Sequence, residues 1–202
     1  MTWVKVCGLT TEADVSNAVE FGADAVGFVL AARSPRKVEV AQAAALMDGL
    51  PLLRILVTAD EDADTVLEAV SRTGADGVQA HGEHADEVAA AAAESGLFVL
   101  RPVPVPPSRG PIDIEPGPGI PLLDSAHPDV LGGSGTSFDW SRISAGEQRF
   151  VLAGGLGPDN VARAVRTLHP WGVDASSRLE LRPGVKDPGK VAAFIARAKG
   201  AA

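Results

Sequence analysis

The length, composition and charge of the chain exclude several classes of protein. It has 202 residues, of which 46% are hydrophobic and 22% charged. It is therefore long enough for one buried core, and its composition is neither that of a disordered chain nor that of a membrane protein. The formal net charge of −8 argues against a nucleic-acid partner, because such partners are bound by basic faces.

The first residues and the single cysteine bear on location and redox chemistry. Met1–Lys5 leads directly into a strand-like pattern and lacks the regions of a signal peptide. No apolar run approaches the roughly 20 residues that a membrane-spanning helix needs. Cys7 has no second cysteine with which to form a disulfide or a thiolate cluster. We therefore expect a cytoplasmic protein without a membrane partner.

Short runs rich in Val, Leu, Ile and Phe alternate with Ala-rich segments, which is the pattern of βα units around a parallel sheet. Eight runs are predicted strands: Trp3–Leu9, Ala25–Leu30, Leu53–Thr58, Gly77–His81, Leu97–Val103, Pro121–Asp124, Phe150–Gly154 and Val173–Ser176. Eight strands predict an α/β fold, a (β/α)8 TIM barrel formed as a single domain by residues 1–202. An open doubly wound sheet is the alternative, but the chain has neither the Gly-rich dinucleotide fingerprint nor the Walker motif.

Helical patterns follow most of the predicted strands. Apolar residues at three- and four-residue spacings predict helices at Glu12–Phe21, Val40–Gly49, Ala63–Thr73, Ala85–Ser95, Pro158–Leu168 and Pro188–Lys199. Thr11, Gly157 and Asp187 are the expected N-caps of three of them, and Pro158 and Pro188 suit a first helical turn.

The connection after the fifth predicted strand is unusually rich in proline. Eight prolines lie between Pro102 and Pro121. Because proline removes a helical hydrogen-bond donor and clashes with the preceding turn, a loop is expected here in place of a helix. The next helix is expected to be one short turn near Phe138–Ile143.

Polar residues at the carboxyl ends of barrel strands are the first candidates for chemistry. Cys7 and Asp124 lie at the ends of the first and sixth predicted strands, Asp174 lies on the eighth, and Arg36 lies in the loop after the second. Side-chain alternation turns these strand residues, together with Lys5, toward the barrel interior. A buried Lys5 needs a carboxylate, which either Asp174 or Asp124 could supply.

Each candidate also has a plain structural interpretation when it is taken alone. A free cysteine such as Cys7 is commonly a small buried residue. Asp124 could be a cap or a strand-end hydrogen-bonding group, and Arg36 a solvated surface charge. His81 is given no role beyond a hydrogen bond at a strand end.

Seven segments at the predicted strands and loops carry motifs in a fixed order. They are Trp3–Thr10, Ala25–Leu30 with Arg33–Arg36, Gly77–Gly82, Leu122–Ser125, Gly132–Trp140, Leu152–Leu156 and Gly172–Ser177. Each alone is a weak signal, but the set is specific. In order and spacing it resembles the phosphoribosylanthranilate isomerases over nearly the whole chain.

The resemblance implies an Amadori rearrangement of N-(5′-phosphoribosyl)anthranilate in tryptophan biosynthesis. An acid protonates the ring oxygen of the ribosylamine and a base removes the C2′ proton. The resemblance assigns Asp124 as general acid, Cys7 as general base, and Arg36 as the partner of the anthranilate carboxylate. These roles suit a carboxyl with a raised pKa and a thiol with a modestly lowered one. The chemistry needs no cofactor, and the four histidines show no zinc-binding spacing.

The substrate phosphate is expected at the loops after the seventh and eighth strands, where barrels often bind it. Gly154 and Gly155 would permit close backbone approach, and Ser176 and Ser177 would add hydroxyl and amide donors, although an ordinary turn and cap is the alternative for both pairs. Asp174 is grouped with these substrate-binding residues.

Two loop positions depart from the family pattern, as does Ala80, which replaces a larger apolar residue of the fourth strand. Arg178 stands where the family usually has Gly, and Thr136 where Lys is common. Arg178 would either add a cation for the phosphate or obstruct backbone approach to it.

The expected partner is a small phosphorylated substrate, bound by a monomer or homodimer. Two other functions stay open. One is a related sugar-phosphate isomerase that also accepts the histidine-pathway analogue, although such enzymes generally pair two aspartates. The other is a catalytically silent barrel that binds a phosphorylated ligand, which the retention of Cys7, Asp124 and Arg36 argues against.

Overall fold

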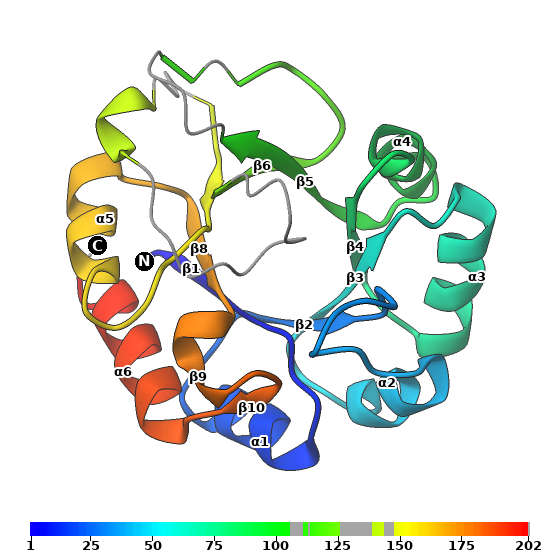
Figure 1. The fold of residues 1–202 in the computed structure, drawn as a ribbon, viewed down its shortest axis with the longest axis horizontal. Coiled ribbons are helices and arrows are strands. Elements are labelled where there is room, and N and C mark those ends of the chain that lie inside the picture. Colours follow the sequence, from blue (N-terminus) through cyan, green and yellow to red (C-terminus); the bar gives the residue numbers. More distant parts are fainter. Residues whose placement is uncertain (106–110, 113, 126–138, 144–147, 202) are drawn as a thin grey trace.

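The strands form a closed, parallel, eight-stranded barrel. The computed structural model describes residues 1–105, 111–112, 114–125, 139–143 and 148–201. Neighbouring strands pair in chain order and the barrel closes where the first strand pairs with the eighth (Figure 1). The strands are β1 (Trp3–Cys7), β2 (Ala25–Val29), β3 (Leu53–Ala59), β4 (Gly77–His81), β5 (Phe98–Val105), β6 (Ile120–Ser125), β7 (Val151–Leu152) and β8 (Gly172–Ala175). The barrel prediction is therefore confirmed, and the open sheet is excluded.

Helices surround the barrel in the predicted places. They are α1 (Glu12–Glu20), α2 (Val40–Met47), α3 (Ala63–Thr73), α4 (Ala85–Glu94), α5 (Val161–Leu168) and α6 (Pro188–Lys199). The predicted caps hold for α1, where Thr11 accepts from the N–H of Asp14, and for α6, where Asp187 accepts from two amides of the first turn.

The predicted start of α5 is wrong. The helix begins at Val161, with Asn160 as its N-cap, rather than at Pro158 with Gly157 as the cap. The Asn160 side chain accepts from the N–H of Gly157 at 2.9 Å and donates to the carbonyl of Gly155 at 2.9 Å. These bonds hold the preceding residues in a non-helical turn, so the helix begins about one helical turn later than predicted.

The connections after β5 and β8 differ from regular βα units. The described residues between β5 and β6 form no helix, and residues 106–110 and 113 lie outside the described part. The short turn expected at Phe138–Ile143 is a 3₁₀ helix, η1 (Trp140–Arg142), and Phe138 lies outside the described residues. After β8 come a second 3₁₀ helix, η2 (Ser177–Leu179), and a hairpin of β9 (Glu180–Arg182) and β10 (Val185–Lys186), none of which the sequence pattern predicted.

Apolar side chains fill the barrel interior near the amino ends of the strands, and also the space between the barrel and the helices. Interior residues form one cluster, and outward residues of the same strands pack with the helices in another. Trp3, Phe98 and Trp171 close the amino end of the interior, where the rings of Trp3 and Trp171 stack with centroids 5.0 Å apart. The interior cluster contains Ala25, Ile55, Leu100, Leu122, Val151 and Ala153. Polar residues are thereby confined to the carboxyl end of the barrel interior.

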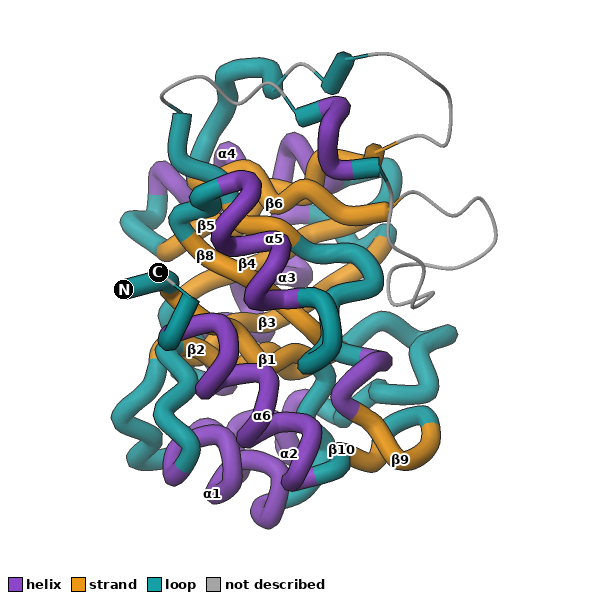
Figure 2. The backbone as a smooth tube through the Cα atoms, turned by 90° about the vertical axis from the view of Figure 1, so that its left-hand side faces the viewer, coloured by secondary structure: helices purple, strands orange, loops and turns teal. Residues whose placement is uncertain are grey.

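The two ends of the barrel carry different parts of the chain. The termini lie together at one end, and η2 with the β9–β10 hairpin lies at the other (Figure 2). Within the described ranges, no helix has the length and apolar character needed to cross a membrane. The hairpin is thus on the same end of the barrel as the carboxyl ends of the strands.

Candidate active site

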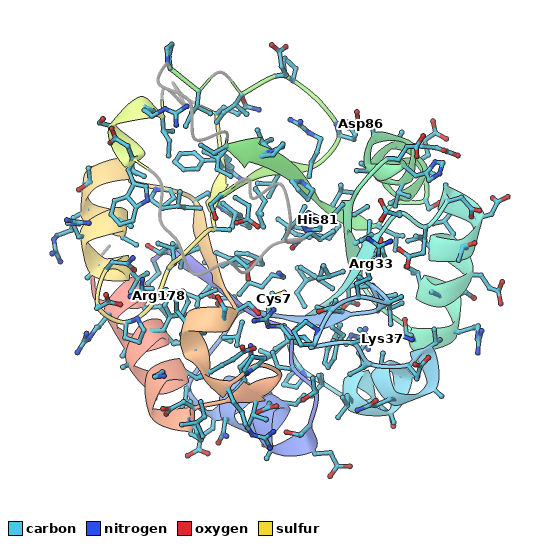
Figure 3. The ribbon with its side chains drawn as sticks, in the orientation of Figure 1. Cys7, Arg33, Lys37, His81, Asp86 and Arg178 are labelled. Carbon is cyan, nitrogen blue, oxygen red and sulfur yellow. The ribbon has the colours of Figure 1, made fainter. Side chains whose placement is uncertain are left out.

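The predicted catalytic residues meet at the carboxyl end of the barrel. Cys7 is the last residue of β1, and Asp124 and Asp174 are each next to last in β6 and β8. Figure 3 shows Cys7 toward the middle of the ring of strands, with His81 of β4 also facing the interior. Because Val4 and Val6 pack in the outer cluster, strand alternation turns Lys5 and Cys7 inward, as predicted.

A buried ion pair lies beneath Cys7. The ammonium of Lys5 is completely buried and donates to Asp174 Oδ2 at 3.0 Å and to Gln79 Oε1 at 2.9 Å. The required partner of Lys5 is therefore Asp174 and not Asp124, because Lys5 and Asp174 are direct neighbours in the β1–β8 register. Asp174 Oδ1 has no hydrogen-bond partner among the described residues, so that oxygen is available to a ligand.

The same lysine fixes the orientation of two neighbouring side chains. An ammonium only donates, so Gln79 must present its carbonyl oxygen to Lys5 and its NH₂ to the ring Nε2 of His81, 2.9 Å away. His81 Nε2 is then an acceptor and the ring proton is on Nδ1. Burial, together with the charge of Lys5, lowers the pKa of His81 to about 4, so the ring is neutral near pH 7.

The environment of Cys7 differs from the expectation. The thiol is buried against Val29, Ala31 and Val57, and this burial raises its pKa above the ordinary value even though the charge of Lys5 opposes the rise. The predicted modest lowering of the thiol pKa is therefore wrong for this structure. Desolvation disfavours the thiolate more than the neighbouring ammonium favours it.

Asp124 has the environment of an acid. Burial and, to a smaller extent, the charge of Asp174 raise the pKa of Asp124 to about 6, in the predicted direction. Its Oδ1 is buried without a hydrogen-bond partner among the residues described. A carboxyl that keeps its proton close to neutrality can donate that proton to a bound molecule.

The predicted phosphate loops lie beside Asp124 and Cys7. Gly154 adopts a φ of +75°, and a Cβ built there would lie 3.0 Å from Asp124 Oδ1 and 2.6 Å from the backbone nitrogen of Ser125. The backbone can pass this close to β6 only because the residue is glycine. On the other side, a Cβ on Gly8 would lie 3.0 Å from Ser176 Oγ. The structure therefore brings the glycine loop and the Ser176 turn to the same end of the barrel as the acid and the thiol.

Arg36 is held by residues that the sequence pattern did not single out. Its Nε and Nη2 donate to the two carboxylate oxygens of Glu180 at 2.7 and 2.9 Å. Glu180 also accepts from Lys186 at 2.8 Å. The predicted Arg36 is thus part of a buried charge cluster and not a solvated surface residue. Glu180 and Lys186 were missed because they lie in the unpredicted hairpin, where no periodic pattern marks them.

Arg178 crosses between two loops at the edge of the site. Its Nη2 donates to both carboxylate oxygens of Asp159, at 2.8 and 2.7 Å. A Cβ on Gly157 would lie 3.0 Å from its Nε, so the side chain rests on the loop before α5 (Figure 3). Thr136 lies outside the described residues.

The described residues contain no group of three or more His, Cys, Asp or Glu side chains that could hold a metal ion. What they do provide is a buried acid, a buried thiol, an arginine held by a carboxylate and two close-approach loops. Such a set can bind an anionic molecule and move protons on it.

Comparison with known proteins gives a consistent result. Residues 4–197 match the family model described as N-(5′-phosphoribosyl)anthranilate (PRA) isomerase. The N-(5′-phosphoribosyl)anthranilate isomerase of Geobacter sp. (strain M21) is 44% identical over 209 residues, covering 98% of this chain and 98% of its own length.

Solved structures agree with the sequence match. The phosphoribosylanthranilate isomerase of Thermus thermophilus is 32% identical with a TM-score of 0.85, covering 98% of this chain and 99% of its own. A phosphoribosylanthranilate isomerase in complex with reduced 1-(o-carboxyphenylamino)-1-deoxyribulose 5-phosphate is 31% identical with a TM-score of 0.78, covering 99% of this chain and 100% of its own. Because sequence and fold both match over nearly the whole length, this chain belongs to the N-(5′-phosphoribosyl)anthranilate isomerase family of enzymes.

Proposed function

We propose that this chain converts N-(5′-phosphoribosyl)anthranilate into 1-(2-carboxyphenylamino)-1-deoxyribulose 5-phosphate, with Asp124 as general acid and Cys7 as general base. The observation that carries the proposal is the buried carboxyl of Asp124, whose pKa is raised to about 6, lying beside the Gly154 loop. We also propose that residues 1–202 fold as one domain and act in the cytoplasm as a monomer or homodimer.

The position of Asp124 suits protonation of the substrate ring. In the ribosylamine, the ring oxygen is bonded to C4′, and C4′ carries the C5′ phosphate. A group that protonates this oxygen must therefore lie close to the phosphate. Asp124 Oδ1 meets that condition if the phosphate binds at Gly154 and Gly155, with Ser176 and Ser177 completing the cradle.

The position of Cys7 suits the other end of the same ring. C2′ is bonded to C1′, which carries the anthranilate nitrogen, so the base must lie toward the aromatic group. A Cβ on Gly8, the residue after Cys7, would lie 2.5 Å from Arg36 Cδ. Arg36 therefore lies beside the residue that follows Cys7, which supports the proposal that its guanidinium binds the anthranilate carboxylate.

The proton transfers balance over the reaction. Asp124 gives its proton to the ring oxygen, the C1′–O bond breaks, and the nitrogen lone pair forms the iminium. Cys7 removes the C2′ proton, which gives an enolamine. Addition of a proton at C1′ and loss of the C2′ hydroxyl proton then yield the aminoketose, so that two protons are added and two are removed. Asp174 pairs with Lys5 through Oδ2, and its Oδ1 has no hydrogen-bond partner among the described residues.

The test is turnover of freshly generated N-(5′-phosphoribosyl)anthranilate, followed by loss of substrate fluorescence. We expect Cys7→Ala and Asp124→Asn each to lose most of kcat, on the order of 10²-fold or more, because each removes a proton-transfer group. Asp24→Asn is the matched control, since Asp24 accepts from the backbone N–H of Val4 and from Lys199 Nζ away from the site.

Three outcomes separate the alternatives. Loss in both variants but not in Asp24→Asn supports the proposal. A folded parent that binds the reduced product but does not turn over would support the silent barrel instead. Turnover of the histidine-pathway analogue by the parent would add a second substrate without changing the assigned groups.

A further inference from the structure

A cluster of three charged side chains lies at the carboxyl end of the barrel, outside the proposed proton-transfer pair. Arg36 comes from the loop after β2, and Glu180 and Lys186 come from the β9–β10 hairpin. The side chains of Glu180 and Lys186 are 4% and 1% exposed, and that of Arg36 is 12% exposed. An uncompensated charge at this depth would be strongly destabilising, so the three must be considered together.

The geometry at Arg36 leaves one edge of its guanidinium open. A guanidinium has five N–H donors in a planar fork. Glu180 takes Nε and one Nη2 donor, which is the side edge. The end edge, formed by Nη1 and the second Nη2 donor, has no partner among the described residues. A planar carboxylate can therefore bind that edge bidentately while Glu180 keeps the other.

Lys186 links Glu180 to the Ser176 turn by hydrogen bonds to both. Its Nζ donates to Glu180 Oε1 at 2.8 Å and to the carbonyl of Ser176 at 3.2 Å. Although burial raises the pKa of Glu180, the bonds from Arg36 and the charge of Lys186 lower it overall, so Glu180 is ionised. Burial lowers the pKa of Lys186, although the carboxylate of Glu180 opposes this fall. The cluster thus has two basic side chains around one carboxylate, an arrangement that suits an anionic ligand.

The hairpin that carries Glu180 is fixed in place by its own contacts. The Thr10 hydroxyl donates to the carbonyl of Gly184 at 2.8 Å, and Lys190 Nζ donates to the carbonyl of Glu180 at 2.7 Å. A Cβ on Gly184 would lie 2.7 Å from the carbonyl oxygen of Pro35, so the turn between β9 and β10 packs closely against the loop that carries Arg36. Glu180 is thus a rigidly held group and not a mobile surface side chain.

We propose that Glu180 is a positioning residue for substrate binding: it holds the guanidinium of Arg36 by its side edge so that the end edge faces the aromatic carboxylate of the substrate. This inference rests on the proposed function. It assigns Glu180 a role through Arg36, with no contact between Glu180 and the reacting atoms. Through Lys186, the same carboxylate is also tied to the turn at Ser176.

The test is a double-mutant cycle of Glu180→Gln and Arg36→Met, with KM and kcat for the proposed substrate and the Kd of the reduced product analogue measured by calorimetry. We expect Glu180→Gln to raise KM and this Kd by about tenfold, the size of one lost charge-assisted hydrogen bond, with kcat changed far less. In the Arg36→Met background, Glu180→Gln should raise neither value further, because its effect passes through Arg36. Inhibition by inorganic phosphate should change less than the Kd of the analogue, because Glu180 reaches the phosphate end only through Lys186, which keeps its own bond to the Ser176 carbonyl.

A second substitution and a matched control separate positioning from stability. Glu180→Asp keeps the charge that Lys186 needs but is one methylene too short to reach both donors of Arg36, so it should raise KM partway even if Glu180→Gln folds poorly. Asp76→Asn breaks a similar bidentate pair with Arg54 outside the site and should lower stability without changing KM.

Other results would overturn the inference. A fall in KM in Glu180→Gln would mean that Glu180 competes with the substrate for Arg36. An equal rise in KM in the Arg36→Met background, or a loss confined to kcat, would mean that Glu180 acts by another route. A parent that neither turns over nor binds the analogue would overturn the proposed function and this inference together, whereas an active parent with unchanged Glu180 variants would overturn only this one.

Discussion

Cys7 and Asp124 hold their protons in the opposite order to the one that their proposed roles require. Burial raises the pKa of the thiol above its ordinary value, and burial with the charge of Asp174 raises that of Asp124 to about 6. The reactive form has Asp124 protonated and Cys7 ionised. Because the acid has the lower pKa of the two, this form is a minor species whose share is constant between the two pKa values and falls outside them.

The pH dependence of kcat/KM should therefore be flat from about pH 6 to the raised pKa of Cys7. It should fall by about tenfold per pH unit on either side, because the fraction of enzyme with Asp124 protonated and Cys7 ionised then falls by that factor. In the residual activity of Asp124→Asn, the break near pH 6 should be absent, since that break belongs to the missing carboxyl. Steady-state rates measured from pH 5 to 10 would check this. A break near pH 6 that persists in Asp124→Asn would contradict the assignment, as would an alkaline limb that survives in Cys7→Ser.

At the scale of elements, the β9–β10 hairpin connects the loops after β1, β2 and β8. The Thr10 hydroxyl bonds to Gly184, Gly184 lies against Pro35, and Lys186 reaches Ser176. The hairpin contributes little to the barrel core, yet it fixes the spacing between Arg36 and the proposed phosphate cradle. Small shifts of such loops have large effects on binding because substrate groups are held at both ends.

Gly184→Ala should separate the contribution of this packing from that of backbone conformation. Gly184 has a φ of +79° and its added Cβ would meet the Pro35 carbonyl, whereas Gly22 has a φ of +83° with nothing within 4 Å. Both substitutions should lower stability by about 1–2 kcal/mol through left-handed strain. Only Gly184→Ala should also raise KM, by about threefold to tenfold, because the hairpin must move off the Arg36 loop. Urea unfolding and steady-state kinetics would measure the two effects. An equal KM for the two variants would show that the hairpin does not set the position of Arg36.

At the scale of the whole molecule, closure of the barrel depends on strands from opposite ends of the chain. β1 pairs with β8, and the stacked rings of Trp3 and Trp171 lie at that junction, 5.0 Å apart. The barrel interior is one continuous packed space, so the loss of one strand pair exposes the core to water. Closure and helix packing should therefore be lost together.

Urea unfolding should accordingly follow one transition by tryptophan fluorescence and by far-UV circular dichroism, with a free energy of unfolding of about 5–15 kcal/mol. Trp140 lies outside the barrel interior under the guanidinium of Arg163, so Trp140→Phe restricts the fluorescence signal to the β1–β8 junction. Midpoints that differ between the two probes in Trp140→Phe would show that the junction opens before the rest of the barrel.

Local sequence patterns were sufficient for the eight barrel strands and the six α-helices, and for which strand residues face inward. The Val, Leu and Ile runs predicted all eight barrel strands, since a strand buried on both faces needs apolar residues throughout. Alternation placed Lys5, Cys7 and Asp174 inside because the side-chain period of a strand is two residues. The start of α5 was misplaced because the Asn160 side chain competes with the helix for the backbone groups of Gly155 and Gly157.

Only the tertiary structure decided the partners and the proton affinities. The choice of Asp174 over Asp124 for Lys5 follows from the closure of β1 on β8, which no local pattern contains. The pairing of Arg36 with Glu180 joins loops from opposite ends of the chain. The raised pKa values of Cys7 and Asp124 arise from burial by the whole barrel. The sequence by itself therefore determined the barrel strands, the α-helices and the chemical types of the predicted site residues, because these depend on neighbours along the chain. The contacts and charges that tune the site depend on distances through space, which exist only once the barrel is closed.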